Sequence, residues 1–423
     1  MQTKNRIPTI DTVGATIVIA KAGQGYNPYR ADIIIPSGST SDQTYLNQAI
    51  AAINATGSGK LCVLDGQYIF DGNINKVNNL IIQGQGMNTI FKIKDGINAT
   101  VGILYGTSVS NIKISNILFN GNATNRVGGT QRGVYFNGSC FNCLVEECGF
   151  TDFHDDCIGI TNSNYIKTIR NYIYNNKATN SDITVWGTSS DCIVKKNYIS
   201  ASQRTAIELN AATNVYNEIS ENIISSSTVG GAGYNIYVVG SKNDIRSNKI
   251  ISCQGNGIYI HGDNNNAESN YIYSPGTDGI YVKSHMNTIH NNTIESATVQ
   301  GIHLDSSWHN EIEGNYVYNS GEYGLYMTNS TNNNIIGNIF KNSSQSANNT
   351  YSNVILGLSD NNNIQNNKCI NDGGANQPKY GIDIFNGDCH LNVVTNNDLI
   401  NSGATASLHD AGTGTVTAAG NRL

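Results

Sequence analysis

The chain of 423 residues is polar but weakly charged: 39% of its residues are hydrophobic and 13% charged, with 44 glycines and 5 prolines. The formal net charge of −6 and the lack of a Lys/Arg run argue against a nucleic-acid partner. No apolar stretch approaches the roughly 18 residues of a membrane span, and no signal peptide is visible at the N-terminus.

Residues 1 to about 30 carry no repeat. Ile17–Ala20 is a candidate strand, and Gly23–Arg30 has the composition of a loop. The sequence Thr40-Ser41-Asp42-Gln43 then precedes apolar residues at helical spacing, which predicts a helix from about 42 to 54 with a polar N-cap. Gly57-Ser58-Gly59 is expected to end this helix.

The first strands of a stack are expected at Leu61–Leu64 and Leu80–Gln83. A four-residue motif of the form Gly-Ile-Tyr-Ile then recurs at intervals of about 22 to 29 residues. Its clearest copies begin at Gly257, Gly279 and Gly301. A fixed period of this size indicates stacked repeats, and the strand-like character of each repeat predicts a β-solenoid.

Most repeats also carry two asparagines five residues apart, as at Asn265/Asn270 and Asn287/Asn292. Asn tolerates left-handed backbone at corners, and stacked copies can form hydrogen-bonded ladders. These asparagines are therefore predicted to be structural.

The nine cysteines are odd in number and irregular in spacing. Cys140 and Cys143 form a lone C-x-x-C, for which a zinc site is one interpretation. Small apolar side chains inside the solenoid are the favoured interpretation, and neither metal nor cofactor is expected.

Alternate residues of a strand face opposite sides, so the Tyr of each motif should face solvent when the flanking Ile residues point inward. This outward column and its neighbour two residues later form a polar face with aromatic rings, a composition typical of sugar-binding surfaces. A tyrosine ladder that only stabilises the sheet is the alternative. The proposed substrate-binding residues of this face are Tyr237, Tyr259, His261, Tyr281, Lys283, His303 and Asp305.

A first polar cluster spans three successive repeats and contains three acidic residues proposed as catalytic: Asp156, Asp182 and Glu208. Strands of neighbouring repeats lie roughly 4.8 Å apart, so such carboxylates could reach the ~5 to 9 Å separation used in glycoside hydrolysis. Residues proposed to bind substrate beside them are His154, Asp155, Trp186 and Arg204. The second cluster, around Tyr281, His303 and Lys283, would instead suit proton abstraction by a lyase or epimerase.

The chain resembles the right-handed parallel β-helix, pectate-lyase-like superfamily over residues 60 to 400. The segments that carry the likeness to the N-terminal module of phage tail proteins are Tyr29-Arg30-Ala31-Asp32, the 40–56 helix, Gly59-Lys60-Leu61, Leu64-Asp65-Gly66-Gln67-Tyr68 and Gln83-Gly84-Gln85-Gly86. The resemblance implies an all-β fold, a single-stranded right-handed parallel β-helix with an N-terminal capping helix. Its members include lyases, hydrolases, epimerases and non-catalytic adhesins, so the reaction stays open.

The expected organisation is an N-terminal segment with the capping helix (1–58), the β-helix (59–402) and a C-terminal cap or subunit-contact segment (403–423). The expected function is that of a tail spike or tail fibre protein that binds cell-surface polysaccharide, with hydrolysis of that polysaccharide left open. The resemblance implies a homotrimer on the virion surface or otherwise outside the cell. A stand-alone polysaccharide lyase or uronate epimerase, and a non-catalytic structural or adhesive protein, are the alternatives.

Overall fold

The computed structural model describes residues 14–24, 31–177, 180–225, 233–417 and 420–423. The chain divides into two units, Met1–Gln203 and Arg204–Leu423. Tyr29 and Arg30 of the expected loop and N-terminal module lie outside the described residues. Both units are built of right-handed parallel β-helix, about 14 coils in all, which confirms the predicted fold class.

Unit 1 contains the N-terminal helix and two sets of parallel strands. Sheet A is made of β1 (Ala15–Lys21), β2 (Ile33–Ile35), β3 (Gly59–Val63), β4 (Gly66–Phe70), β6 (Leu80–Ile93), β8 (Ile112–Asn120), β10 (Phe141–Glu146), β11 (Gly149–Thr151), β13 (Asn164–Ile169), β14 (Tyr172–Tyr174), β16 (Ile193–Lys195) and β17 (Tyr198–Ser200). Sheet B is made of β5 (Ile74–Asn75), β7 (Val101–Thr107), β9 (Gln131–Asn137), β12 (Ile158–Thr161) and β15 (Ile183–Trp186).

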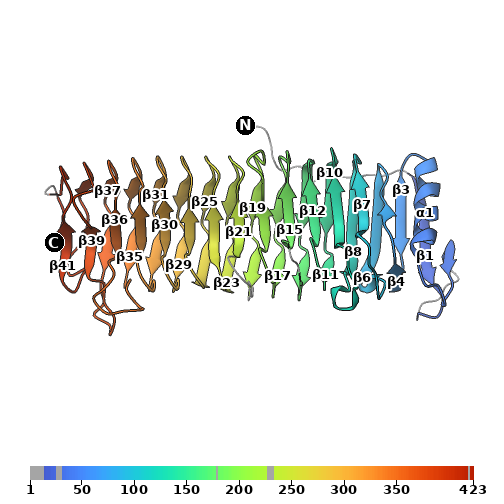
Figure 1. Cartoon of the computed structure of the whole chain (residues 1–423). Helices are drawn as coiled ribbons and strands as arrows, with labels where there is room; N and C mark the ends of the chain where they lie inside the picture. Colours follow the sequence, from blue (N-terminus) through green and yellow to red (C-terminus); the bar gives the residue numbers. More distant parts are fainter. Residues whose placement is uncertain (1–13, 25–30, 178–179, 226–232, 418–419) are drawn as a thin grey trace. The chain divides into compact units, whose positions relative to one another are not determined.

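The predicted helix is present as α1 (Gln43–Ala55) and covers the start of the stack beside β1 and β3 (Figure 1). Its apolar face is buried through Leu46, Ala49, Ile50 and Ile53. Strand β1 pairs in parallel with β3, so the stack begins earlier in the chain than the sequence suggested.

Asp42 does not cap α1 with its side chain, contrary to the sequence-based expectation. Its carboxylate is fully buried and accepts hydrogen bonds from Lys21 Nζ at 2.6 Å and from the backbone N–H of Ile69 at 2.7 Å. The carboxylate therefore joins the helix to two strands of the stack, because a buried charge requires these partners more than the helix end requires a cap.

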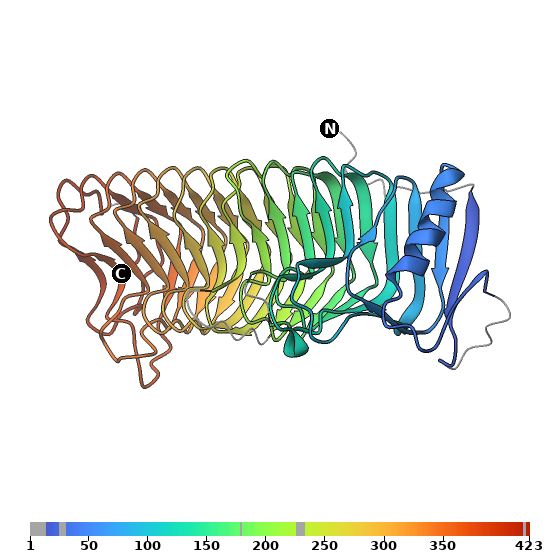
Figure 2. The same ribbon diagram turned by 45° about the vertical axis from the view of Figure 1, so that its right-hand side comes forward.

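Unit 2 repeats one pattern, in which one strand in sheet B is followed by two short strands in sheet A in every coil from β18 to β38, and by one strand after β39 (Figure 2). The sheet B strands are β18 (Ile207–Leu209), β21 (Tyr234–Val238), β24 (Asn256–Ile260), β27 (Ile280–Val282), β30 (Ile302–Asp305), β33 (Leu325–Thr328), β36 (Val354–Gly357), β39 (Tyr380–Ile384) and β41 (Ala406–Asp410). The sheet A strands are β19 (Glu218–Ser220), β20 (Ile223–Ser225), β22 (Asp244–Arg246), β23 (Lys249–Cys253), β25 (Asn266–Glu268), β26 (Tyr271–Pro275), β28 (Thr288–His290), β29 (Thr293–Glu295), β31 (Glu311–Glu313), β32 (Tyr316–Tyr318), β34 (Asn334–Ile336), β35 (Ile339–Lys341), β37 (Asn363–Gln365), β38 (Lys368–Ile370) and β40 (Val393–Thr395).

The isoleucines of the repeated motif form a continuous interior file. Ile236, Ile258, Ile280 and Ile302 pair in register from coil to coil, and each is fully buried. Asn235 precedes Ile236, whereas a glycine precedes each of the other three, where the chain approaches the core. A Cβ on Gly279 would lie only 2.4 Å from Cγ2 of Ile294. The pairing of β41 with β39 carries sheet B into the last twenty residues.

The paired asparagines form two buried ladders inside unit 2, as predicted. In one of them, both the backbone N–H and the side-chain NH₂ of Asn310 donate to Oδ1 of Asn333, at 2.8 and 3.1 Å. Asn333 repeats both bonds to Asn362 and also donates to the carbonyl of Ser307 at 3.2 Å. Each Asn thus fixes the height and register of the next coil.

The left-handed backbone at these corners belongs to the residue before each ladder Asn, not to the ladder Asn as the sequence suggested. Met286, His309, Asn332 and Leu391 have φ values of 57°, 57°, 56° and 55°. Bulky residues adopt this conformation at a cost of order 1 kcal/mol. The ladder hydrogen bonds of the following Asn offset that cost.

In unit 1 the corresponding corners are less uniform. Asn171 and Asn197 form one ladder step, with the Asn171 N–H donating to Asn197 Oδ1 at 3.0 Å. Cys148 precedes them, and its N–H donates to Asn171 Oδ1 at 3.1 Å.

All nine cysteines are free thiols and eight are buried, which agrees with the interpretation of Cys as a small core residue.

The ladder can be tested with two neighbouring asparagines. Asn333→Ala removes a buried side chain that bonds to the coils on both sides, and it leaves the donors of Asn310 without their acceptor. We expect a loss of about 2 to 4 kcal/mol in the free energy of unfolding, measured by denaturant titration. Asn334→Ala, one residue later on the exposed face of β34, should change it by less than about 0.5 kcal/mol. Equal effects of the two substitutions would contradict the ladder as the main source of register.

Candidate functional site

Two of the predicted acidic residues, Asp155 and Asp156, lie together in unit 1 and are almost fully buried. Oδ2 of Asp155 accepts a hydrogen bond from Arg132 Nε at 2.6 Å, and Oδ2 of Asp156 lies 3.5 Å from the same nitrogen. The hydroxyl of Thr184 donates to Asp156 Oδ1 at 2.6 Å. Arg132, which the sequence did not single out, also covers the ring of Tyr135 at 4.5 Å. These contacts hold both carboxylates in place. Next to them, burial lowers the pKa of His154.

Asp182, predicted to be catalytic, lies inside the solenoid with no exposed surface. Asn176 Nδ2 donates to its Oδ1 at 2.6 Å, and burial raises its pKa to about 6 against the hydrogen bonds from Asn176 and Ser202. Asp182 occupies the position that Gly279 and Gly301 hold in unit 2, directly before the inward Ile. The carboxyl group of Asp182 is therefore enclosed in this structure, and its catalytic role stays a prediction.

Trp186 is exposed on β15, as expected of a sugar-stacking residue, with 54% of its surface accessible. Glu208 belongs to unit 2, where it is nearly buried on β18 and pairs in register with Tyr237. Arg204 also belongs to unit 2. A joint site of Glu208 and Arg204 with the unit 1 carboxylates therefore stays a prediction.

The second predicted cluster forms a ladder of stacked rings on sheet B of unit 2. The ring centroids of Tyr237 and Tyr259 are 5.3 Å apart, and those of Tyr259 and Tyr281 are 4.8 Å apart. His303 continues the ladder at 4.7 Å from Tyr281 and 4.9 Å from Tyr326. The rings point away from the core, but they cover one another, and Tyr259 is only 7% exposed. The expectation that Tyr259 faces open solvent was therefore wrong.

Three further predicted residues lie beside this ladder of rings, two positions further along the chain: His261, Lys283 and Asp305. The hydroxyl of Tyr281 donates to Asp305 Oδ2 at 2.6 Å, and Lys283 Nζ lies 3.5 Å from the same oxygen. Burial and this hydrogen bond raise the pKa of Tyr281. Burial alone would raise the pKa of Asp305, but the bonds from Tyr281 and Ser306 and the charge of Lys283 lower it. The ring of His261 stacks on Tyr259 at 5.9 Å.

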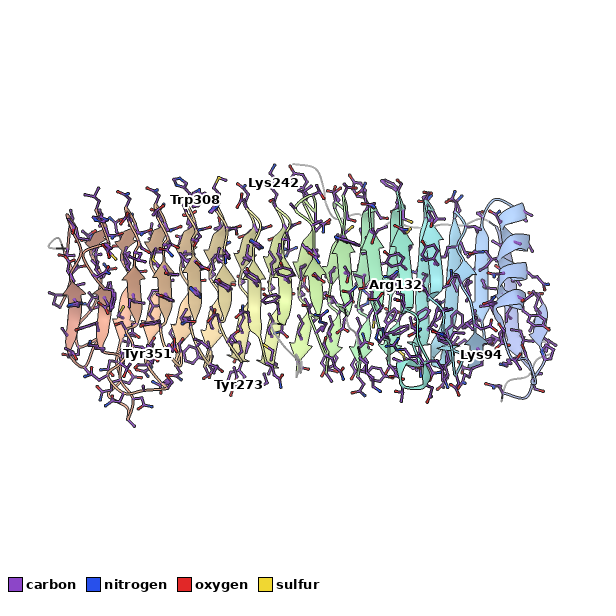
Figure 3. All side chains as sticks on the ribbon, in the orientation of Figure 1. Lys94, Arg132, Lys242, Tyr273, Trp308 and Tyr351 are labelled. Atoms are coloured by element: carbon purple, nitrogen blue, oxygen red, sulfur yellow. The ribbon has the colours of Figure 1, made fainter. Side chains whose placement is uncertain are left out.

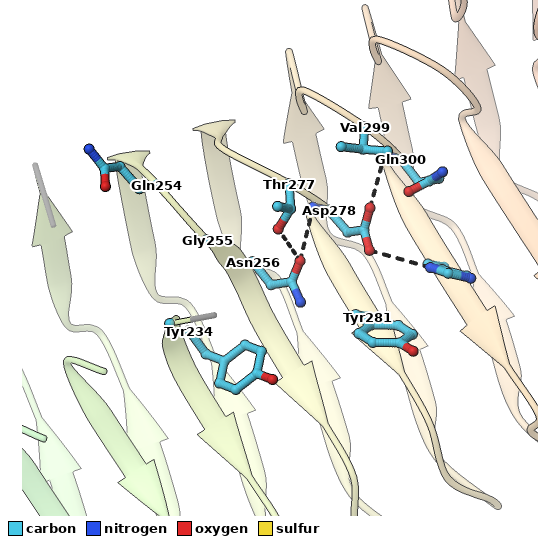
Figure 4. Close-up of a pocket in the computed structure, with 11 residues that line it drawn as sticks. Tyr234, Gln254, Gly255, Asn256, Thr277, Asp278, Tyr281, Val299 and Gln300 are labelled. Carbon is cyan, nitrogen blue, oxygen red and sulfur yellow. Dashed lines mark hydrogen bonds and ion pairs between the residues drawn. The ribbon is translucent and has the colours of Figure 1, made fainter. Parts of the chain in front are cut away.

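A pocket of about 400 Å³ opens beside this ladder. Its lining combines aromatic rings with amide, hydroxyl and carboxylate groups: Gly233, Tyr234, Gln254, Gly255, Asn256, Thr277, Asp278, Tyr281, Val299, Gln300 and His303 (Figure 4). We refer to it as the sheet B pocket.

Asp278 organises the polar side of the sheet B pocket. Its Oδ2 lies 3.3 Å from His303 Nδ1, and its Oδ1 accepts the backbone N–H of Gln300 at 3.1 Å. Its own N–H donates to Asn256 Oδ1 at 3.0 Å, and Thr277 donates to the same oxygen. The other ring nitrogen of His303, Nε2, is buried and makes no hydrogen bond. It is therefore not placed to take a proton from a ligand in the pocket.

Sequence reasoning missed Asn256, Asp278 and Gln300. Each lies two residues before an inward Ile, and together with Tyr234 they form a third file along sheet B. In four successive coils this position is occupied by Tyr, Asn, Asp or Gln. Aligning the repeats on their inward Ile would have shown this file of polar and aromatic residues.

Comparisons with known proteins support the fold. The family model described as periplasmic copper-binding protein (NosD) matches residues 225–351, and no match was found among curated proteins. A tailspike variant of E. coli bacteriophage HK620, solved in complex with a hexasaccharide, is similar with a TM-score of 0.67 and 13% identity, over 92% of this chain and 76% of that chain. Tailspike protein 3 of bacteriophage CBA120 has a TM-score of 0.58 and 12% identity, over 91% of this chain and 59% of that chain. The Azotobacter vinelandii mannuronan C-5 epimerase AlgE6 A-module has a TM-score of 0.45 and 17% identity, over 91% of this chain and 96% of that chain. At these identities the tailspike likenesses establish the right-handed parallel β-helix fold.

Within the described ranges, no three His, Cys, Asp or Glu side chains form a group that could hold a metal ion. No helix of the described chain is long and apolar enough to cross a membrane.

The buried state of Asp182 gives a pH-dependent prediction. Because its folded pKa of about 6 lies above the ordinary value of 3.8, ionisation costs stability as pH rises from about 4 to 6. Asp182→Asn removes this cost. The stability of the variant relative to the native chain should therefore improve by on the order of 2 to 3 kcal/mol between pH 4 and pH 7. Denaturant titrations of both proteins at the two pH values measure this difference. A constant difference would mean that Asp182 ionises without penalty.

Proposed function

We propose that the chain is a polysaccharide-binding β-helix protein of the tail spike or tail fibre type, and that unit 2 holds its glycan in the sheet B pocket. The lining of the pocket supports this proposal. The rings of Tyr234 and Tyr281 lie there beside three polar side chains, those of Asn256, Asp278 and Gln300. Aromatic rings pack against the apolar faces of sugars, and precisely placed polar groups bind their hydroxyls.

The tailspike likenesses support this proposal through the fold, since one of those proteins was solved with a bound hexasaccharide. A tail spike role places the protein on a virion surface or otherwise outside the cell, as a homotrimer. We propose this location and this trimeric assembly for the chain, and a mass measurement of the protein in solution tests the trimer.

The geometry supports binding more directly than cleavage. A uronate lyase or epimerase at the second cluster would need an accessible base: the free ring nitrogen of His303 is buried, and the exposed Lys283 lies 3.5 Å from the carboxylate of Asp305. Hydrolysis by the first cluster would rely on Asp156, Asp182 and Glu208, all of which are buried.

The binding site can be tested with two tyrosines on different sheets of unit 2. Tyr281→Ala removes a pocket wall and should weaken binding to a polysaccharide ligand at least tenfold, since such rings supply much of the contact energy. Tyr273→Ala removes an exposed ring on β26 of sheet A and should leave binding unchanged (Figure 3). Calorimetric titration with ligands found on a glycan array measures both, with thermal unfolding as the check on folding. Normal binding by Tyr281→Ala would place the site elsewhere.

Cleavage stays a separate prediction with its own measurement. If the first cluster hydrolyses the bound glycan, new reducing ends should appear with the native chain and be lost with Asp156→Asn and with Glu208→Gln. Bound glycan that never yields reducing ends would limit the function to adhesion.

A further inference from the structure

The orientation of one amide defines the donor at the base of the sheet B pocket. Oδ1 of Asn256 accepts the backbone N–H of Asp278, a group that can only donate, so the carboxamide cannot be reversed. Its NH₂ therefore points to the opposite side, toward the rings of Tyr234 and Tyr281 (Figure 4). A ligand held between these rings meets a neutral hydrogen-bond donor.

The charged groups around the pocket are predominantly acidic and are already engaged. Asp278 faces His303 Nδ1 at 3.3 Å, and Glu322 accepts the side-chain NH₂ of Gln300 at 2.9 Å. Lys283, on the next column, lies 3.5 Å from Asp305.

The lining residues include neither Lys nor Arg. The segment 226–232, which precedes the lining residue Gly233 and lies outside the described residues, has the sequence Ser-Ser-Thr-Val-Gly-Gly-Ala and adds no charge.

From this arrangement we infer that the sheet B pocket selects neutral sugars, hydroxyl-rich or N-acetylated, and rejects uronic acids. A sugar carboxylate placed between Tyr234 and Tyr281 would approach Asp278 without gaining a cationic partner, and like charges in a partly enclosed site repel strongly. A hydroxyl or an acetamido carbonyl accepts from the Asn256 NH₂ without this cost. This inference rests on the proposed glycan-binding function and names the substrate class of the same site.

The test compares neutral and acidic oligosaccharides on the full chain. A glycan array grouped by charge, followed by calorimetric titration of the strongest binders, should show neutral or N-acetylhexosamine oligosaccharides binding at least tenfold more tightly than oligogalacturonates of equal length. Uronides that bind as tightly as neutral glycans would overturn the inference while leaving glycan binding intact. An array with no bound glycan of either class would overturn the proposed function as well.

A charge placed at the rim provides the converse test. Gln254 lines the pocket and is exposed, so Gln254→Lys adds a cation without disturbing the core. It should raise oligogalacturonate binding severalfold at low salt, and about 0.5 M NaCl should remove most of the gain. Gln254→Met, of similar length and uncharged, should show no gain. A Gln254→Lys protein with unchanged uronide binding, or an equal gain with Gln254→Met, would contradict the role assigned to charge.

Discussion

The asparagine ladders inside unit 2 are the interaction on which its architecture depends. Each ladder Asn satisfies a backbone N–H and a carbonyl of neighbouring coils in a place that water does not reach, so an absent side chain leaves several buried groups without partners. Hydrophobic contact alone would allow one coil to slip against the next, because one isoleucine packs much like another. The amides make the alignment specific.

This alignment tolerates coils of different length. Ladder partners are 22 residues apart between Asn270 and Asn292 but 29 apart between Asn338 and Asn367, with the same pattern of hydrogen bonds. The additional residues of the longer coil include the segment around Ser344 and Tyr351, between β35 and β36. Residues can thus be inserted at the corners of a coil, while the files of side chains on sheet B remain in line.

The sequence predicted the interior of the molecule well and its surface less well. The inward isoleucines and the ladder asparagines follow from periodicity, because stacked coils repeat the same environment at the same position. The burial of Tyr259 did not follow, since alternation gives the direction of a side chain but not what its neighbours cover. The burial of Asp182 did not follow either, because Asp182 lies directly before the first residue of β15, where alternation along a strand gives no direction. A Cβ at the same position of another coil, Gly279, would meet the core residue Ile294, which indicates how little room there is for a side chain that points inward.

We propose that the register set inside the coils builds a glycan site on sheet B of unit 2. A crystal structure of the full chain with a neutral oligosaccharide tests it most directly. We expect a sugar ring between Tyr234 and Tyr281, within hydrogen-bond distance of the Asn256 NH₂, with both asparagine ladders unchanged. A glycan bound instead on sheet A or in unit 1, with the sheet B pocket empty, would contradict it.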